Sequence, residues 1–135
     1  MKPRRRFKII VYSLLLVILL ALVIWSWQYS SAQARDYERL ADLKVAQAQL
    51  LNYYLKFNTF TIPYCQTPLT LSDCQGQDRQ KISLSDLLDP LNTGSYRYDL
   101  VHLGEDNFQI NFALEIGAAG LPAGVYKMTK VGVSR

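Results

Sequence analysis

Residues 9–27 read IIVYSLLLVILLALVIWSW, a predominantly apolar run without a charged residue, a proline or a glycine. With a rise of ~1.5 Å per residue, a helix over this run would be roughly 28 Å long, close to the thickness of the hydrocarbon core of a bilayer. The run therefore predicts a transmembrane helix, and the lipid bilayer is the first partner that the sequence implies.

The two sides of this run differ in charge. Residues 1–8 carry five cations, namely Lys2, Arg4, Arg5, Arg6 and Lys8. Of the fifteen Lys and Arg, ten follow the run, where they face eleven Asp and Glu. Since the cytoplasmic flank of a membrane helix carries the excess of Lys and Arg, we expect residues 1–8 to be a basic cytoplasmic tail. Residues 28–135 are then an extracytoplasmic domain.

The basic tail also explains the formal net charge of +4. A nucleic-acid-binding protein would carry its basic residues on a folded face, so no nucleic-acid partner is expected. Both ends of the run hold side chains suited to the membrane interface. The expected anchors are Arg4, Arg5 and Arg6 on the cytoplasmic side and Trp25 and Trp27 on the outer side.

The main alternative is a secretory signal peptide that is removed after export. Ala32-Gln33-Ala34 has the small-x-small pattern of a cleavage site. The apolar segment of a signal peptide is usually about 7–15 residues long, which is shorter than the run seen here and favours a retained anchor. Both alternatives place the following domain, which is long enough for one small core, outside the cytoplasm.

An amphipathic helix is predicted over residues 28–57. The chain has no proline or glycine between Arg4 and Ile62, and good helix formers dominate this part. One face collects the apolar side chains Leu40, Leu43, Leu50, Leu51, Tyr54 and Phe57, interrupted by Gln47. This helix should continue the membrane helix and lie on a core, although Ser30 and Gln33 could form a capping box that restarts it.

Ion pairs at i,i+3 spacing are expected on the polar side of this helix. They are Arg35 with Glu38, and Arg39 with Asp42.

An irregular loop is predicted over residues 58–83, where proline, glycine and small polar residues gather. Cys65 and Cys74 both lie in this loop, and in an exported domain they are expected to form one disulfide. Metal binding by the cysteines is the competing interpretation. It has little support, because His102 is the only histidine and the sequence has no C-x-x-C motif.

The last third of the chain shows the two-residue period of strands. A short helical turn at residues 84–88 precedes it. Strands are predicted at residues 96–101, 108–116 and 124–133, with a hairpin loop at 104–107 and a longer connection at 117–124. The predicted fold class is α+β: a long N-terminal helix, first transmembrane and then amphipathic, packed on a three-stranded antiparallel meander over residues 96–133.

No catalytic site or cofactor site is predicted, so the protein is not expected to be an enzyme. His102 stands at a strand end, where a solvated or structural role is favoured over that of a general base. Oxygen ligands for calcium are present, but their spacing matches no EF-hand loop; they are Asp89, Asn92, Asp99 and Asp106. An aromatic group is assigned to core packing; it consists of Tyr53, Tyr54, Tyr96 and Tyr98.

The order of these segments resembles that of type IV pilins and of the pseudopilins of type II secretion. Local stretches that carry the likeness are residues 34–43 (ARDYERLADL), residues 50–54 (LLNYY) ahead of Phe60 and Pro63, Asp89-Pro90 followed by Gly94 and Tyr96-Arg97-Tyr98, and residues 112–115 (FALE). The resemblance covers most of residues 9–133. It implies a pilin-like fold and other pilin-like subunits or assembly proteins as partners.

The N-terminus departs from the family pattern. That pattern has a small residue before an apolar mature start and a Glu at the fifth mature position. Here Arg6 precedes Phe7, Val11 takes the fifth position, and the first thirty-five residues hold no acid. We therefore expect an anchored structural or accessory subunit of a pilus or secretion-like apparatus that keeps its tail. The alternative function is a membrane-tethered binding module that uses the disulfide loop.

Overall fold

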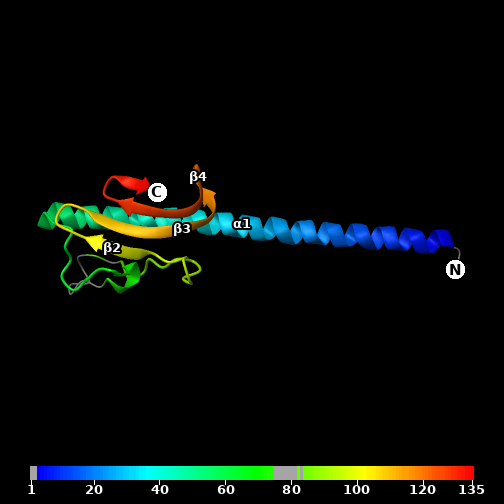
Figure 1. The fold of residues 1–135 in the computed structure, drawn as a ribbon, viewed down its shortest axis with the longest axis horizontal. Coiled ribbons are helices and arrows are strands. Elements are labelled where there is room, and N and C mark those ends of the chain that lie inside the picture. The colour runs from blue at the N-terminus through cyan, green and yellow to red at the C-terminus, as the bar shows by residue number, and fades with distance from the viewer. Residues whose placement is uncertain (1–2, 75–81, 83) are drawn as a thin grey trace. The chain divides into compact units, whose positions relative to one another are not determined.

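The computed structural model describes the chain apart from residues 1–2, 75–81 and 83, and it describes residues 3–6 by their backbone only. The chain forms two compact units, one that ends at Ala32 and one that runs from Gln33 to Arg135. A single helix, α1 (Pro3–Phe57), contributes residues to both units (Figure 1). Ser30 and Gln33 both lie within α1, so the alternative in which the helix restarts there is wrong.

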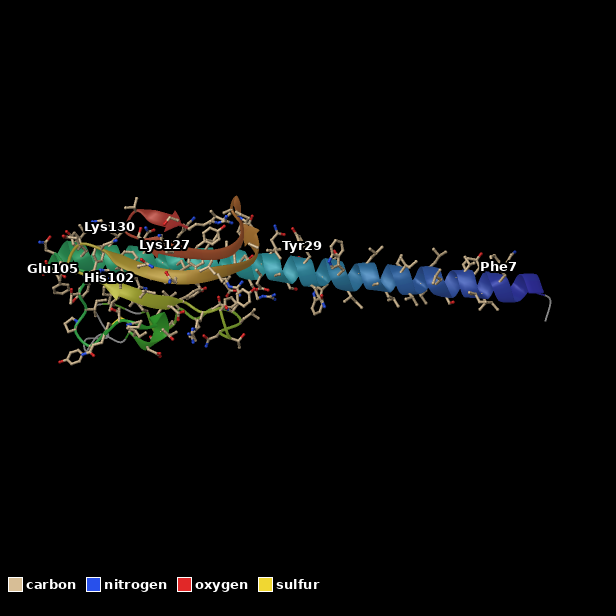
Figure 2. All side chains as sticks on the ribbon, in the orientation of Figure 1. Phe7, Tyr29, His102, Glu105, Lys127 and Lys130 are labelled. Carbon is tan, nitrogen blue, oxygen red and sulfur yellow. A yellow bond between two sulfur atoms is a disulfide. The ribbon has the colours of Figure 1, made fainter. Side chains whose placement is uncertain are left out.

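The first unit is helical and presents its apolar side chains to the outside. From Phe7 to Trp27 every large apolar side chain is exposed, between 38% at Val11 and 73% at Trp27. Figure 2 shows side chains projecting from this part of the ribbon, with Phe7 and Tyr29 labelled. The helix is long and apolar enough to cross a membrane, which agrees with the predicted helix over residues 9–27.

In the second unit, α1 buries the predicted apolar face. Leu40, Leu43, Ala46, Leu50 and Tyr53 are in the core, and Leu51 and Tyr54 are packed against it. These residues recur every three or four positions, so they lie along one side of the helix. The predicted face extends too far at its end, because Phe57 is 43% exposed. Its ring lies tilted by 40° against that of Tyr53, with 4.6 Å between the centroids.

The helix ends at a residue with a left-handed backbone conformation. Asn58 has a φ of 54° and its backbone N–H donates to Tyr54 O at 2.7 Å. Asparagine is one of the residues that tolerates this conformation after a helix. The irregular segment that follows contains a short 3₁₀ helix at Leu71–Asp73.

The sheet has five antiparallel strands in the order β1-β2-β3-β4-β5, so each strand lies next to its neighbour in sequence. The strands are β1 (Leu69–Thr70), β2 (Asp99–Leu103), β3 (Phe108–Ala118), β4 (Leu121–Thr129) and β5 (Gly132–Ser134). Figure 1 shows β2, β3 and β4 running alongside the second part of α1. The α+β class is confirmed, whereas the three-stranded meander is replaced by five strands.

The differences from the predicted strands have local causes. The first predicted strand begins at Asp99 and not at Tyr96, because Thr93 and Tyr96 form a tight bridge just before it. Residues 117–124, predicted as a long connection, contain the ends of β3 and β4 joined by Ala119 and Gly120. Both of these residues have positive φ, at 52° and 82°, as a tight two-residue hairpin turn requires.

In β3 buried and partly exposed side chains alternate as far as Phe112, after which Ala113 is buried together with Leu114. Phe108, Ile110, Phe112 and Leu114 are buried, and they alternate with Gln109 and Asn111, which are partly exposed. Ile116 falls outside this pattern because the pairing of β3 with β4 shifts between Leu114 and Gly117. This irregularity lies at the cluster of charged residues that is described with the candidate site.

Gln47, which interrupts the apolar face of the helix, has a packing role. Its Nε2 donates to the carbonyl oxygens of Thr129 at 2.9 Å and Lys130 at 3.3 Å. These two residues begin the turn between β4 and β5, so the amide ties the helix to that turn.

Candidate functional site

A fully buried arginine stands where α1, the loop before β2 and strand β3 meet. Arg39 is 0% exposed. Its Nε and Nη2 donate to the two carboxylate oxygens of Asp89 at 2.6 and 3.0 Å, and its Nη1 donates to Asp36 and to Glu115, each at 2.7 Å. The ring of Tyr96 lies 4.8 Å from the guanidinium carbon. The prediction that Arg39 pairs with Asp42 on the polar side of the helix is wrong, because Arg39 points into the core.

Asp36 connects the same helix to the backbone of β3. Its carboxylate accepts the N–H groups of Glu115, Ile116 and Gly117 at 2.9, 2.9 and 2.8 Å. The shift in the β3–β4 pairing leaves these N–H groups free to turn toward the helix. Gly117 fits this place because its φ is 104° and an added Cβ would stand 2.3 Å from Leu121 O.

Arg35 closes the cluster from its half-exposed side. Its Nε and Nη2 donate to the two carboxylate oxygens of Glu115 at 2.8 and 2.6 Å. The prediction that Arg35 pairs with Glu38 therefore gives way to a bidentate bond with a residue eighty positions further along the chain. Bidentate arginine–carboxylate bonds fix geometry as well as charge.

The protonation states follow from these contacts. Burial raises the pKa of Asp36, but the three backbone N–H groups and Arg39 outweigh it, and the pKa of that carboxyl lies below its ordinary value. The bond from Arg35 holds the pKa of Glu115 below its ordinary value despite some burial. Burial lowers the pKa of Arg39, but its bonds to Asp89, Glu115 and Asp36 prevail and raise it. All three groups are charged at neutral pH.

A second polar pair lies one helical turn away. The hydroxyl of Tyr98 donates to Asp42 Oδ2 at 3.1 Å. Burial raises the pKa of Tyr98 and, to a smaller extent, that of Asp42, whose bond from Tyr98 only partly offsets it. Asp42 thus differs from Asp36, because no cation among the described residues is bonded to it and it is easier to protonate.

The acidic side chains of the cluster are bonded to arginines and to backbone N–H groups. Both oxygens of Asp89 are occupied by Arg39, and one also accepts the N–H of Leu91 at 2.9 Å. Asp99 pairs with Arg97 at 2.9 Å. Among the described residues no three acidic, histidine or cysteine side chains are grouped to hold a metal, so the calcium set drawn from sequence is not brought together there.

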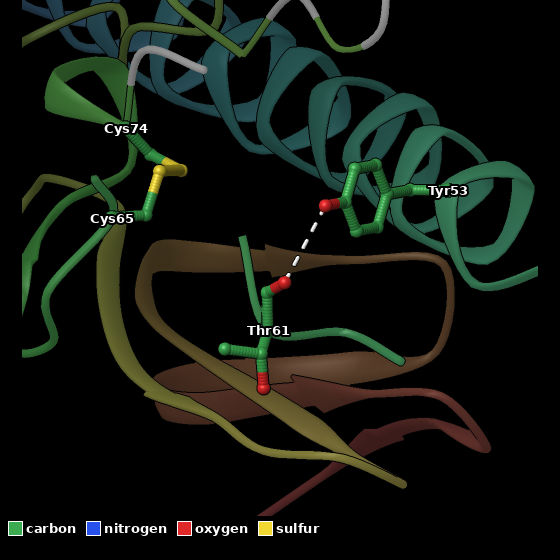
Figure 3. The surroundings of a disulfide bond; sticks show 4 residues. All are labelled: Tyr53, Thr61, Cys65 and Cys74. Atoms are coloured by element: carbon green, nitrogen blue, oxygen red, sulfur yellow. Dashed lines mark hydrogen bonds between the residues drawn. A yellow bond between two sulfur atoms is a disulfide. The ribbon is translucent and has the colours of Figure 1, made fainter. Parts of the chain in front are cut away.

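The disulfide loop is the second feature of interest. Cys65 and Cys74 are bonded, with 4.9 Å between their Cα atoms, which confirms the predicted pairing. Figure 3 shows this bond near Thr61, whose carbonyl oxygen accepts the hydroxyl of Tyr53 at 3.4 Å. The loop is also held at its start by Phe60, which is stacked on Tyr54 and edge-on to Phe108 at 4.6 and 5.1 Å.

The remaining predicted residues lie apart from these features. Trp25 and Trp27 are exposed on the first unit, and the side chains of Arg4, Arg5 and Arg6 lie outside the described residues. His102 is exposed on β2, opposite Gln109 (Figure 2). Of the four tyrosines assigned to the core, Tyr53 and Tyr98 are buried, whereas Tyr54 and Tyr96 are only partly buried.

The sequence analysis did not predict the charge cluster, although the position of Asp36 on the helix indicated that this residue is buried. At 100° per residue, Asp36 and Leu43 are separated by about 20° around the helix, so Asp36 faces the core. A charged residue on an apolar face indicates a buried pair. Comparison with protein-family models, curated proteins and solved structures finds no match.

Proposed function

We propose that this protein is a membrane-anchored, pilin-like structural or accessory subunit of a type IV pilus or type II secretion-like apparatus. The observation that supports this proposal most is that the two parts of α1 differ in exposure. The part from Phe7 to Trp27 exposes a continuous apolar surface, whereas the part from Asp36 to Tyr53 packs in the core of a small domain. A helix built in this way suits a protein that is held in lipid and presents a domain at the surface.

The contacts of the domain fit a structural role. The buried charges of the cluster are committed to one another and to the backbone of β3, and the disulfide fixes the loop after the helix. Such an arrangement gives a fixed surface on a fixed scaffold. The work of the protein is then binding to other subunits, with residues 1–8 in the cytoplasm and the domain outside.

The N-terminus decides between an anchored subunit and a self-polymerising pilin. In the family that the sequence resembles, a Glu near the processed terminus pairs with a neighbouring subunit, whereas Val11 holds that position here. A buried charge is costly in a membrane unless it is paired, so that pair fixes the register of neighbouring subunits. Val11 carries no charge and cannot form the pair. We therefore propose that the protein keeps its basic tail and remains anchored at full length.

Two measurements on the protein extracted from its own membrane test this proposal: mass spectrometry of the protein and its migration on a native gel. The expected species retains residues 1–8 and co-migrates on a native gel with the platform protein or ATPase of a pilus or secretion apparatus. A mature form that begins at Phe7 with a methylated amine would replace the accessory role by a filament role. Migration as a free species would remove the apparatus from the proposal.

A further inference from the structure

A tight turn with an unusual residue leads into Cys65 of the disulfide. Ile62, Pro63, Tyr64 and Cys65 form it, and the N–H of Cys65 donates to Ile62 O at 3.1 Å. Proline at the second position and a φ of 74° at Tyr64 are the features of a type II turn. The third position of such a turn is ordinarily glycine or asparagine, because the left-handed conformation crowds any other side chain.

Tyr64 differs from the other described residues in this conformation. The non-glycine residues with positive φ are Asn58, Tyr64, Asn92 and Ala119, so Tyr64 is the only one with a large side chain in the described part of the chain. Backbone strain of this kind persists only where the surroundings hold it. Among the described residues, no hydrogen bond or ring contact of the side chain accounts for a tyrosine at this position.

The ring of Tyr64 is turned outward. The residue is 67% exposed, and within the described part of the chain its side chain has no hydrogen bond or ring contact. This contrasts with Tyr53, Tyr98 and Tyr126, whose hydroxyls donate to Thr61, Asp42 and Pro122. The aromatic side chain of this turn therefore makes no hydrogen bond and no ring contact within these residues.

The turn itself is held firmly on both sides of Tyr64. Ile62 is 4% exposed and Cys65 is 7% exposed, so both flanking side chains are core residues. Cys65 is bonded to Cys74, which is 1% exposed. A ring on such a turn loses little conformational freedom when it is bound, and preorganisation of this kind favours affinity.

The chemistry of the surrounding loop fits a protein surface. From Asn58 to Ser72 the chain has no charged residue, and its polar groups are hydroxyls and amides. Tyrosine among small uncharged polar residues is typical of loops that bind proteins, because the rigid ring supplies contact area and the neighbours supply adaptable hydrogen bonds. Tyrosine is also enriched among the few residues that carry most of the energy of a protein interface.

We propose that Tyr64 is the central contact residue for a second protein, and that its ring enters an uncharged pocket on that protein. The inference rests on the proposed function, since the second protein is taken to be another subunit of the same membrane apparatus. In this proposal the left-handed turn serves to hold the ring outward.

The test begins with the full-length protein in its own membrane. A photo-crosslinking phenylalanine, p-benzoylphenylalanine, replaces Tyr64 in one variant and Tyr37 in a control. Tyr37 is a matched position because it is an aromatic residue of α1 that is 52% exposed. The expected result is an adduct with one protein subunit of the apparatus from position 64 and none from position 37.

Two substitutions then separate contact from folding. Tyr64→Asn removes the ring and suits the left-handed turn, so the melting temperature should rise by about 3–6 °C while recovery of the cross-linked subunit by co-purification falls at least tenfold. Tyr64→Phe keeps the ring and the strain, so both quantities should stay near those of the wild type.

Three results would overturn the inference. They are equal adducts from positions 64 and 37, a polydisperse adduct that is carbohydrate and not protein, and a Tyr64→Asn variant that co-purifies its subunit normally. If the protein still migrates with the apparatus while position 64 gives no adduct, the inference fails and the proposed function stands. If the protein migrates alone, the proposed function fails with it.

Discussion

At the scale of single residues, the decisive fact is that Arg39 and Asp36 are buried as charges. Taking ions out of water is unfavourable, and their mutual attraction compensates only when every hydrogen-bonding group is satisfied. Here Arg39 binds three carboxylates and Asp36 accepts three backbone N–H groups. No buried side-chain nitrogen or oxygen among the described residues lacks a partner.

Substitution of Asp36 should therefore be severe. Asp36→Asn removes a charge from Arg39 and places an amide N–H₂ against backbone donors, so we expect a loss of about 3–5 kcal/mol in the free energy of unfolding. Glu38→Gln is the matched control, because Glu38 is exposed on the same helix. Urea unfolding of the two purified variants measures the difference. Similar midpoints would show that the cluster does not hold the fold.

The pH dependence follows from the same residues. Asp36 and Glu115 have pKa values below their ordinary ones, so each adds stability that is present above its unfolded-state pKa, roughly 4. That stability is lost as the pH falls through the lower pKa of the folded state. Asp42 acts in the opposite direction: its pKa is raised, so it adds stability that is fully present below its unfolded-state pKa and is lost as the pH rises through its folded-state pKa.

Unfolding measured between pH 2 and 7 should show both effects. We expect stability to fall steeply below about pH 4, and the fall should be shallower in Glu115→Gln. Asp42→Asn should remove the loss of stability as the pH rises through the pKa of Asp42. If Glu115→Gln loses stability below about pH 4 as steeply as the wild type, Glu115 does not contribute to the pH dependence as stated here.

At the scale of elements, β3 carries the core of the sheet. Phe112 is 2% exposed, pairs with Tyr126 in register, and lies with its ring centroid 5.8 Å from that of Tyr126. Phe112→Asp puts an unpaired charge into this layer and should destabilise the domain by several kcal/mol. Asn111→Asp, one residue away on the other face, should be mild. Equal thermal shifts for the two variants would contradict the register.

The disulfide should act on the loop more than on the whole fold. In the chain-entropy model a loop of this length contributes ~2–3 kcal/mol. The double variant Cys65→Ser, Cys74→Ser should therefore unfold at a lower temperature but keep the far-UV spectrum of the wild type. Free labelling of both thiols in the exported wild-type protein without reductant would contradict the bond.

The sequence predicted those elements whose signal is local and long enough. The helix and β3 have many turns or alternations, so their periods are distinct. β1 and β5 have two and three residues, too few for a period to appear. The turn at Ala119–Gly120 was missed because the surrounding Gly117, Pro122 and Gly124 indicate an irregular loop, although the strands continue through them.

The site was predictable only in part. The disulfide followed from two cysteines in a domain that the sequence predicts to be exported. The position of Asp36 on the apolar face gave a sign of burial, but its partners could not be inferred. Asp89 lies fifty residues and Glu115 seventy-six residues from Arg39, and only the packed sheet brings them together.

For the whole molecule, the proposed role requires that the apolar part of α1 crosses a membrane. The first unit exposes its large apolar side chains from Phe7 to Trp27, and burying them in lipid would gain roughly 25 cal/mol per Å² of apolar surface. The cations of residues 1–8 favour the cytoplasm for the tail. The disulfide suits the oxidising side of the membrane for the domain.

A reporter fused after Arg135 tests whether the C-terminal domain lies outside the cytoplasm. Alkaline phosphatase folds only outside the cytoplasm and green fluorescent protein exported in the unfolded state does not fluoresce, so the pair reports the side of the C-terminus. We predict a membrane-bound, active phosphatase fusion and a dark fluorescent fusion. A fluorescent fusion with an inactive phosphatase would place the domain in the cytoplasm and contradict the account.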